Sequence, residues 1–391
     1  MKILVVTPTF FPIMGGAEVG ISEIYRRLIQ RHEVRILTPW PDKILTRDYG
    51  IEESLYHFSN EFVLRFKDRV NLKKWPGQWK LKGIIPPFSL STVAVSLKSV
   101  RKFKPEIVNM FYPLPTGLAA VSVERLKKTP TVLSIIGRDI PGPNIPSLWK
   151  NYAKSVSRAV SERIYISEYC RKALFGPDSD DGEIIPFGVD TDKFKPDLDG
   201  SQIKKALKIP VGMTVLFALQ RLDQWKRVDV IIQAMKYVLK KKDVFLVIGG
   251  KGSEKDRLVQ MTEDLGLSSR IFFTGYIKED DLPLYYAMAD LFVFHSTYET
   301  FGVALLQAMA AGIPIVTIDT TAIPELIHHN QNGILVEPLD PSGLADAVVS
   351  LLEDKGAMVR FSEESRKIIM EKYDWDCVAA SYEKVFHRCL Q

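Results

Sequence analysis

The sequence predicts an α/β protein built from two parallel-sheet domains, and three observations lead to this prediction. Short apolar runs of strand length alternate with segments whose apolar residues recur every three or four positions. This alternation occurs twice, and a polar, less patterned stretch at residues 197–208 separates the two series. The chain of 391 residues is too long for one ordinary hydrophobic core and suits two. We therefore expect one domain over residues 1–196, a second over 197–372 and a closing amphipathic helix over 373–391.

The composition is that of a soluble globular protein, with 46% hydrophobic and 25% charged residues. The net charge of +5 is mild for this length and does not indicate a nucleic-acid partner. The apolar run at the N-terminus is too short for a signal peptide and suits a first buried strand. Cys170, Cys377 and Cys389 form no CxxC pair, so we expect a protein of the reducing cytoplasm.

The first elements form a strand–helix–strand unit. Residues 3–6 are apolar and predict a strand, and a loop containing Gly15 and Gly16 follows. A helix begins near Glu18, and residues 34–37 predict the next strand. Such units stack into a parallel, Rossmann-like sheet. The glycines do not have the GxGxxG spacing, so the dinucleotide fingerprint is absent.

Residues 61–104 are less regular and strongly basic, with eleven Lys or Arg residues and two Asp or Glu residues. The aromatic residues Phe62, Phe66, Trp75, Trp79 and Phe88 lie among them. This pattern fits peripheral docking on an anionic membrane surface or on a lipid-linked substrate. The alternative is a solvated loop whose tryptophans pack on their own domain, and the sequence leaves both interpretations open.

Further strands are predicted along both halves of the chain. In the first half they lie at residues 107–110, 131–136 and 164–166, and in the second half at 214–219, 244–248 and 271–273. Helices are expected at residues 228–239 and 282–288, and a further helix follows the glycine-rich residues 249–252 and ends near residue 265.

The most informative stretch runs from residue 290 to residue 319. It predicts a buried strand, a loop with Glu299, a helix after Gly302 and a second strand. Free N–H groups at the start of a helix hold anions, and a glycine lets a ligand approach the backbone. A carboxylate beside them accepts hydrogen bonds from hydroxyl groups. The stretch therefore predicts a site for a phosphate next to a sugar.

Two cations follow the strand at residues 214–219. Arg221 and Lys226 are expected at the carboxyl edge of a parallel sheet, where such folds bind ligands. Together they can neutralise a diphosphate leaving group. For an isolated pair of charges, solvent exposure on a loop is the simpler explanation. Tyr276 and Ile277 follow another strand and offer a flat ring and backbone groups to a base, although an ordinary turn is the alternative.

No metal site is expected. The six histidines are scattered, and the adjacent His328 and His329 would point in different directions on a regular element. Asp280 and Asp281 suit the start of a helix better than a magnesium site. Neither GxSxG nor a GxxxxGK[ST] loop occurs.

These residues together carry a resemblance to a known family. The second half contains Arg221-x4-Lys226, then GGKG at residues 249–252, then FTGYI, HSTYETFG and AMAAGIPIV in that order. The first half contains GGAE at residues 15–18, Gly137-Arg138-Asp139 and IIPFGVDTDKFKP. The chain resembles the retaining glycosyltransferases of family four (glycosyltransferase group 1), which have the two-domain GT-B fold. The resemblance also implies that the closing helix crosses back to the N-terminal domain.

The resemblance implies roles for individual residues in binding a UDP- or GDP-sugar donor without a metal or other cofactor. Arg221 and Lys226 match the pair that binds the diphosphate, and Gly16 matches the glycine that meets the distal phosphate. Glu299 matches the first acid of the family's E-x7-E motif, which holds hydroxyls of the transferred sugar. Further donor contacts are implied for Tyr276, Ile277, Phe301, Gly302, Val303, Ala304 and Gln307, and Arg221, Lys226 and Glu299 are the expected catalytic residues.

Two positions depart from the family pattern. Gln307 stands where the second acid of E-x7-E is expected, and a glutamine keeps one carbonyl acceptor but loses the charge. Ile136 stands where many members place a histidine near the acceptor. Asp139 is then the remaining polar candidate on the acceptor side, unless it only caps the turn that follows it.

The resulting hypothesis is a cytoplasmic, metal-independent hexosyltransferase that retains the anomeric configuration. Its acceptor would be a sugar, a lipid-linked molecule or a polysaccharide, and it would work in the cytoplasm or at the cytoplasmic face of the membrane. Two alternatives stay open. One is an epimerase or phosphorylase-like enzyme on the same fold, and the other is a degenerate, non-catalytic partner that binds sugar nucleotides.

Overall fold

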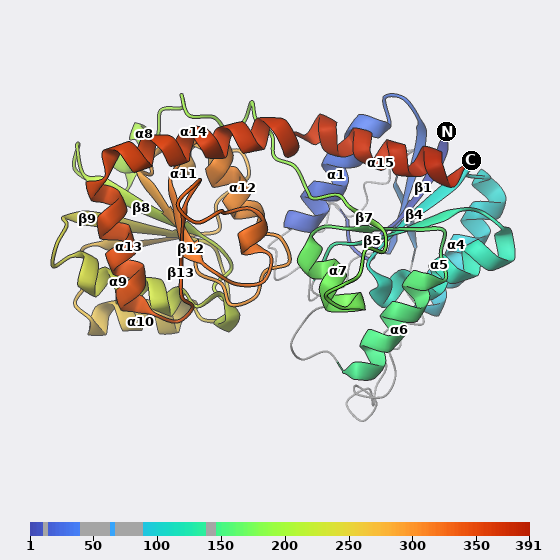
Figure 1. Cartoon of the computed structure of the whole chain (residues 1–391), viewed down its shortest axis with the longest axis horizontal. Helices are drawn as coiled ribbons and strands as arrows, with labels where there is room; N and C mark the ends of the chain where they lie inside the picture. Colours follow the sequence, from blue (N-terminus) through green and yellow to red (C-terminus); the bar gives the residue numbers. More distant parts are fainter. Residues whose placement is uncertain (11–14, 40–62, 67–88, 138–145) are drawn as a thin grey trace. The chain divides into compact units, whose positions relative to one another are not determined.

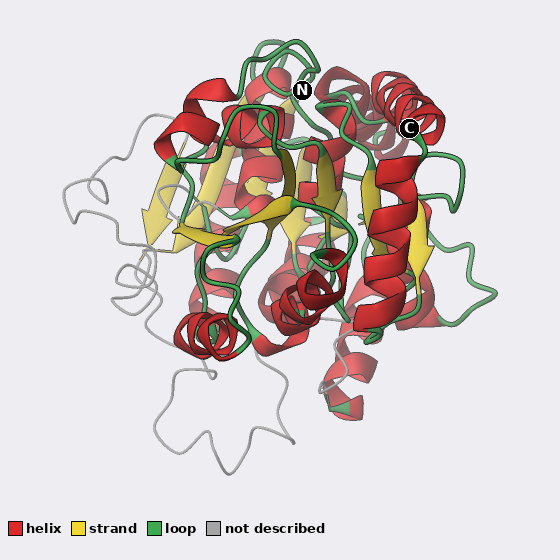
Figure 2. Ribbon diagram, turned by 90° about the vertical axis from the view of Figure 1, so that its left-hand side faces the viewer, coloured by secondary structure: helices red, strands yellow, loops and turns green. Residues whose placement is uncertain are grey.

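The computed structural model describes residues 1–10, 15–39, 63–66, 89–137 and 146–391, and it contains two compact α/β units (Figures 1 and 2). The first unit comprises residues 1–187 and 375–391, and the second comprises residues 188–374. In each unit a parallel sheet is covered by helices on both faces. The predicted fold class, two Rossmann-like parallel-sheet domains, is confirmed.

The sheet of the first unit has seven strands in the order β3-β2-β1-β4-β5-β6-β7. The strands are β1 (Lys2–Val6), β2 (Glu33–Pro39), β3 (Val63–Phe66), β4 (Ile107–Phe111), β5 (Thr131–Ile135), β6 (Glu162–Tyr165) and β7 (Glu183–Ile184). The helices are α1 (Gly16–Leu28), α4 (Leu90–Phe103), α5 (Pro113–Lys127), α6 (Ser147–Arg158), α7 (Glu168–Phe175) and α15 (Trp375–Cys389). Every residue of β4 and β5 is buried, as expected for strands covered on both faces.

The sheet of the second unit has six parallel strands in the order β10-β9-β8-β11-β12-β13. The strands are β8 (Thr214–Leu219), β9 (Val244–Gly249), β10 (Ile271–Gly275), β11 (Leu291–Val293), β12 (Ile315–Ile318) and β13 (Ile334–Val336). The helices are α8 (Ser201–Ala206), α9 (Val228–Val238), α10 (Lys255–Asp264), α11 (Leu282–Ala287), α12 (Val303–Ala310), α13 (Pro341–Glu353) and α14 (Lys355–Lys372), with 3₁₀ turns η3 (Gln224–Lys226) and η4 (Ile323–Glu325). The strand order reverses between β8 and β11, where doubly wound sheets bind their ligands.

The basic segment is more regular than its sequence suggested. Helix α4 occupies residues 90–103, and the side chain of Ser89 caps it by accepting a hydrogen bond from the backbone N–H of Thr92 at 3.0 Å. Its buried stripe is Thr92, Ser96, Val100 and Phe103, which recur at helical spacing. Two of these four residues are polar, so a search for apolar periodicity does not detect the helix. Residues 61–62 and 67–88, with most of the aromatic positions, lie outside the described residues.

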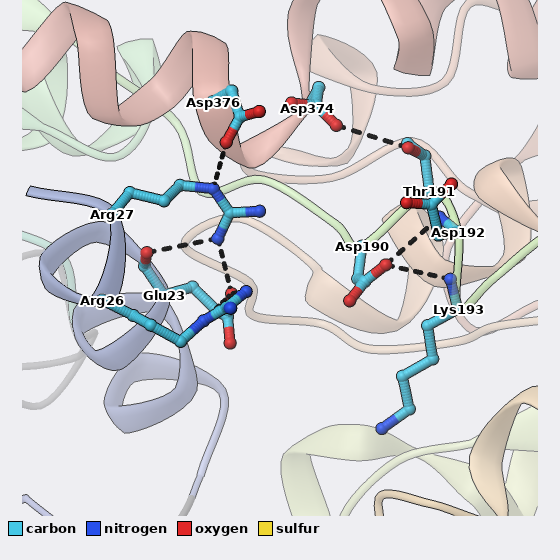
Figure 3. Close-up of polar contacts among 9 residues, drawn as sticks. All are labelled: Glu23, Arg26, Arg27, Asp190, Thr191, Asp192, Lys193, Asp374 and Asp376. Atoms are coloured by element: carbon cyan, nitrogen blue, oxygen red, sulfur yellow. Dashed lines mark hydrogen bonds and ion pairs between the residues drawn. The ribbon is translucent and has the colours of Figure 1, made fainter. Parts of the chain in front are cut away.

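The chain passes between the units at different residues from those expected. Residues 188–196, which the sequence analysis assigned to the first domain, cluster with the second unit. The backbone N–H of Val189 donates to the carbonyl of Tyr373 at 2.8 Å, and Thr191 donates to the carboxylate of Asp374 at 3.3 Å (Figure 3). Residues 197–208, expected as a linker, contain helix α8, and Gly200 packs directly against the backbone of Met288.

The C-terminal helix α15 belongs to the first unit, where it lies beside α1 (Figure 1). Trp375 packs on Phe187 with ring centroids 6.0 Å apart. Figure 3 shows Arg27 joining the two helices, with ion pairs to Asp376 at 2.5 Å and to Glu23 at 2.6 Å. Among the helices that the structure describes, none is both long and apolar enough to cross a bilayer.

Candidate functional site

The candidate site residues of the second unit lie on four loops at the carboxyl edge of its sheet. Arg221 and Lys226 follow β8, Tyr276 and Ile277 follow β10, and Glu299 follows β11. The glycine-rich segment at residues 249–252 follows β9. Because all these strands are parallel, their carboxyl ends meet at one edge, and the loops are brought together there.

The glycines at residues 249–252 allow two loop backbones to touch. A Cβ atom on Gly250 would lie 1.9 Å from the carbonyl oxygen of Gln220, and one on Gly252 would lie 2.1 Å from that of Leu222. Gly250 also has φ of +127°, a conformation that side chains disfavour. The N–H of Leu222 donates to the carbonyl of Lys251 at 2.9 Å. The glycines therefore shape the loop that carries Arg221.

Lys226 and Glu299 form an ion pair that joins the loop after β8 to the loop after β11. Their side chains are only 15% and 12% exposed. The two loops are further joined by Thr297, whose N–H and hydroxyl both donate to the carbonyl of Trp225 at 3.0 Å. The side-chain amide of Gln220 donates to the carbonyl of Lys226 at 2.9 Å, which holds the lysine backbone. The predicted cation and the predicted sugar-binding carboxylate are thus direct neighbours.

Arg221 is positioned by a carboxylate of its own loop. Its Nε donates to Oδ2 of Asp223 at 2.6 Å, and Asp223 is 7% exposed while Arg221 is 55% exposed. The buried carboxylate fixes the position of the guanidinium, and the arginine side chain remains partly accessible to a ligand. Asp223 was not singled out from the sequence, although the spacing Arg-x-Asp after a strand contained the signal.

Helix α12 begins at Gly302, whose φ of +106° suits a residue without a side chain. The N–H groups of Val303 and Ala304 have no acceptor within the helix, because the first N–H groups of any helix precede the first intrahelical bonds. Phe301 is buried, and its ring packs 6.2 Å from that of Tyr373. The backbone N–H of Glu299 donates to the hydroxyl of Thr321 at 3.1 Å, which fixes the loop that leads into the helix. The arrangement suits an anion beside a carboxylate.

Gln307 lies one turn further along α12, at a partly exposed position. The hydroxyl of Tyr286 donates to its side-chain oxygen at 3.0 Å and contacts the carbonyl of Ala304 at the same distance. Tyr286 is fully buried, and burial followed by the negative charge of Glu279 raises its pKa well above the ordinary value. The tyrosine therefore stays protonated and can act only as a fixed positioning group. Its role is not visible from the sequence, since nothing in the spacing connects α11 to α12.

Tyr276 and Ile277 occupy different environments after β10. Tyr276 is 55% exposed, and Nζ of Lys251 lies 5.5 Å from the centre of its ring. Ile277 is buried, and its side chain packs against Gly249. A ligand at this edge can therefore reach the ring of Tyr276, whereas Ile277 offers only its backbone.

His295 lies at the start of the loop that carries Glu299, and it is fully buried. Its Nε2 accepts a hydrogen bond from the N–H of Leu339 at 3.2 Å. Burial, followed by the positive charge of Arg227, lowers the pKa of His295 to about 4. The imidazole is therefore neutral near pH 7 and supports the loop.

The remaining predicted residues belong to the first unit. Gly16 is exposed at the N-terminus of α1, just after β1. Glu18 accepts hydrogen bonds from the hydroxyl of Thr9 and from the N–H of Gly15, so the acid of the GGAE sequence caps this helix. Ile136 is buried at the end of β5. Asp139, the acceptor-side candidate, lies outside the described residues.

No cluster of three or more His, Cys, Asp or Glu side chains suited to a metal ion occurs within the described ranges. The histidines expected to diverge have separate roles: the N–H of His328 donates to Asn332 at 2.7 Å, and Nδ1 of His329 accepts from Leu335 at 3.1 Å. Asp281 is at the N-cap of α11, but its side chain makes no capping hydrogen bond.

Two family models match the chain, one in each half. Residues 14–193 match the model described as Glycosyltransferase Family 4, and residues 199–368 match the model described as Glycosyl transferases group 1. This chain is a glycosyltransferase. Each half of the enzyme matches a model of the kind of glycosyltransferase that its motifs resemble, and the enzyme has the two-domain GT-B fold.

Two relatives of this glycosyltransferase match nearly its whole length. It is 25% identical over 397 aligned residues to N-acetyl-alpha-D-glucosaminyl L-malate synthase of Bacillus anthracis, covering 98% of this chain and 96% of the relative. It is also 26% identical over 397 residues to a GDP-mannose-dependent alpha-(1-6)-phosphatidylinositol monomannoside mannosyltransferase of Mycobacterium tuberculosis. That alignment covers 97% of this chain and 96% of the relative.

Solved structures share its fold at lower identity. HepE of Anabaena, solved in complex with UDP, superposes with a TM-score of 0.78 at 22% identity, covering 99% of this chain and all of that chain. Sucrose-phosphate synthase of Thermosynechococcus elongatus also gives a TM-score of 0.78, at 17% identity, and the superposition covers 99% of this chain and 98% of the synthase.

Proposed function

We propose that this enzyme transfers a hexose from a UDP- or GDP-sugar to an acceptor hydroxyl, with retention at the anomeric carbon and without a metal ion. The observation that carries the proposal is the pairing of Lys226 with Glu299 beside the N-terminus of α12. It combines a cation and helix N–H groups for the diphosphate with a carboxylate for sugar hydroxyls. The names of the relatives agree, since one is GDP-mannose-dependent and one neighbour binds UDP.

The chemistry assigned to these residues is electrostatic. The bond between the anomeric carbon and the leaving phosphate oxygen breaks, and its electron pair stays on the phosphate. The acceptor oxygen forms the new bond on the same face and gives its proton to that phosphate oxygen. Arg221, Lys226 and the amides at the start of α12 stabilise the charge that develops on the diphosphate. Glu299 holds the sugar in position, and no protein nucleophile is assigned.

The base and ribose of the donor are assigned to the same edge of the sheet. The exposed ring of Tyr276 and the backbone of Ile277 would contact the base. Gln307, held by Tyr286, would contact the ribose as a neutral group where the family pattern has an acid. Gly16, at the N-terminus of α1, would contact the distal phosphate.

The acceptor is proposed to be a sugar, a lipid-linked molecule or a polysaccharide, and the enzyme is proposed to act in the cytoplasm or at the cytoplasmic face of a membrane. The basic segment at residues 61–104 supports peripheral contact with anionic lipid. Within its described part, the last turn of helix α4 and the residue that follows the helix carry the exposed basic residues Arg101, Lys102 and Lys104.

A transfer assay tests this proposal. Purified enzyme is incubated with UDP- and GDP-hexoses and with acceptors that include malate, inositol phosphates and phosphatidylinositol mannosides, in the presence of EDTA. We expect one donor to give a product with retained anomeric configuration, detected by NMR. A strict requirement for a divalent ion, or an inverted product, would contradict the mechanism.

The diphosphate assignment makes a quantitative prediction for Arg221. Arg221→Ala should lower kcat by about a hundredfold or more, as when one donor to a developing anion is removed. Arg257→Ala is the matched control, because Arg257 is also about half exposed but lies on α10, paired with Glu254. A kcat for Arg221→Ala within a few-fold of the control would show that Arg221 does not stabilise the leaving group.

A further inference from the structure

The two cations assigned to the diphosphate are both paired with carboxylates in the structure, but in different ways. Arg221 pairs with Asp223 on its own loop, and its side chain remains 55% exposed. Lys226 pairs with Glu299 from another loop, and both side chains are mostly buried. Among the residues that the structure describes, Lys226 and Glu299 form ion pairs only with each other. Asp223 is not assigned to any part of the donor, whereas Glu299 is itself a candidate ligand-binding group.

Binding of a complete sugar nucleotide can replace both halves of this buried pair. The diphosphate supplies negative charge to Lys226, and hydroxyls of the sugar supply hydrogen-bond donors to Glu299. A nucleoside diphosphate without its sugar replaces only one half. It takes Lys226 and leaves the Glu299 carboxylate unpaired next to a second anion, which is unfavourable in a poorly solvated position.

We propose, on the basis of the proposed function, that the Lys226–Glu299 ion pair makes the site favour the intact donor and expels the nucleoside diphosphate product. While the sugar is attached, its hydroxyls occupy Glu299 and Lys226 is available to the phosphate. Once the sugar has moved to the acceptor and left, Glu299 competes with the product for Lys226. The ion pair then re-forms as the diphosphate leaves.

The surrounding contacts keep the two groups within reach of each other throughout this exchange. The double hydrogen bond from Thr297 to the carbonyl of Trp225 holds the two loops together independently of the ion pair. Gln220 holds the backbone of Lys226, and Thr321 holds the backbone of Glu299. Only the side-chain ends need to change partners, so the exchange requires no rearrangement of the fold.

Glu299→Gln tests the proposal, because glutamine keeps the size and an acceptor but removes the charge. Binding of UDP, GDP, UDP-glucose and GDP-mannose to the full chain is measured by titration calorimetry. We expect the bare diphosphate to bind the variant about tenfold more tightly than it binds the wild type. The sugar nucleotide should bind the variant equally or more weakly, so the ratio of the two affinities shifts towards the product.

Asp223→Asn is the matched control. It also removes a carboxylate next to a predicted phosphate-binding cation, but Asp223 is not assigned to the sugar. It should change the affinities for diphosphate and sugar nucleotide by similar factors and leave their ratio unchanged. If Glu299→Gln behaves like this control, or if it does not tighten diphosphate binding, the proposal is overturned.

A second measurement needs no variant. Free hexose that occupies Glu299 should free Lys226, so wild-type enzyme saturated with the matching hexose should bind the diphosphate more tightly, and the coupling should be reciprocal. Absence of this coupling would contradict the proposal even if Glu299→Gln failed to fold. Failure of the wild type to bind any nucleotide would overturn the proposed function together with this inference, whereas binding without coupling would overturn the inference alone.

Discussion

At the scale of single residues, the polar groups of the second unit divide into those proposed to bind the donor and those that hold the loops. Arg221, Lys226 and Glu299 were identified from the sequence because charged residues after the strands of a parallel sheet are expected at one edge. Asp223 and Tyr286, which position Arg221 and Gln307, were not identified. The role of Tyr286 depends on a contact between two helices that no spacing along the chain predicts, whereas Asp223 lies two residues after Arg221 and that spacing contained the signal.

His295 provides a pH-dependent prediction at this scale. Its pKa is about 4 in the folded protein and ordinarily 6.5, so between these values the unfolded chain binds more protons than the folded one. The contribution of His295 to stability is therefore complete above about pH 6.5 and is lost as the pH falls towards 4, by about 3 kcal/mol in total. Thermal unfolding at about pH 7 and about pH 5 measures the first part of this loss, about 2 kcal/mol.

His295→Gln is the comparison for this prediction. Glutamine can accept the hydrogen bond from Leu339 but does not titrate. Wild type should lose more stability than the variant over the same pH range. Equal losses in the two proteins would show that His295 titrates normally in the folded state.

At the scale of elements, the alternation of strands and helices was predictable and some details were not. The strand at the start of the chain, the strand–loop–helix segment around Glu299 and the repeated parallel units follow from apolar periodicity and glycine placement. Helix α4 was not predicted, because half of its buried stripe is polar. The linker expected at residues 197–208 is an ordinary surface segment with helix α8, since polarity alone does not distinguish a linker from an exposed helix.

The glycines after β9 give a prediction at this scale. Gly250→Ala should displace the loop that carries Arg221, because the added Cβ would lie 1.9 Å from the carbonyl oxygen of Gln220. We expect a loss of stability of about 1–3 kcal/mol and weaker diphosphate binding, measured by thermal unfolding and calorimetry. Gly212→Ala is the control, since Gly212 has φ of +84° but open space around its Cβ position. Equal effects of the two substitutions would show that backbone strain alone, and not the contact with Gln220, is responsible.

At the scale of the whole molecule, the chain forms two compact units. The first unit contains the last helix of the chain, α15, in addition to residues 1–187. The boundary near residue 187 was not predictable, because residues 188–196 are held in the second unit by backbone and guanidinium contacts. The guanidinium of Arg366 donates to the carbonyls of Thr191 and Phe194 at 3.1 Å and 3.0 Å. Such contacts between distant parts of the chain leave no pattern in composition.

The position of α15 predicts which unit depends on it. Trp375→Ala should destabilise the first unit by about 3–5 kcal/mol, since the buried ring packs on Phe187. The second unit should be unaffected, and calorimetric scans with added nucleotide identify its transition as the one that rises with ligand. Met370→Ala on α14, at a 51% exposed position, is the control. A selective loss in the second transition would contradict the assignment of α15 to the first unit.

The most direct test of the central claim is the thermal stability of the full chain against a panel of nucleotides and nucleotide sugars, with and without EDTA. A ligand that binds only the folded protein must raise its stability by mass action. If the second unit holds a metal-free site for a diphosphate and a sugar, one nucleotide family will raise the unfolding temperature in EDTA, and Lys226→Ala will abolish the shift. If no nucleotide raises it, or if the shift survives in Lys226→Ala, the site assigned here is not where the donor binds.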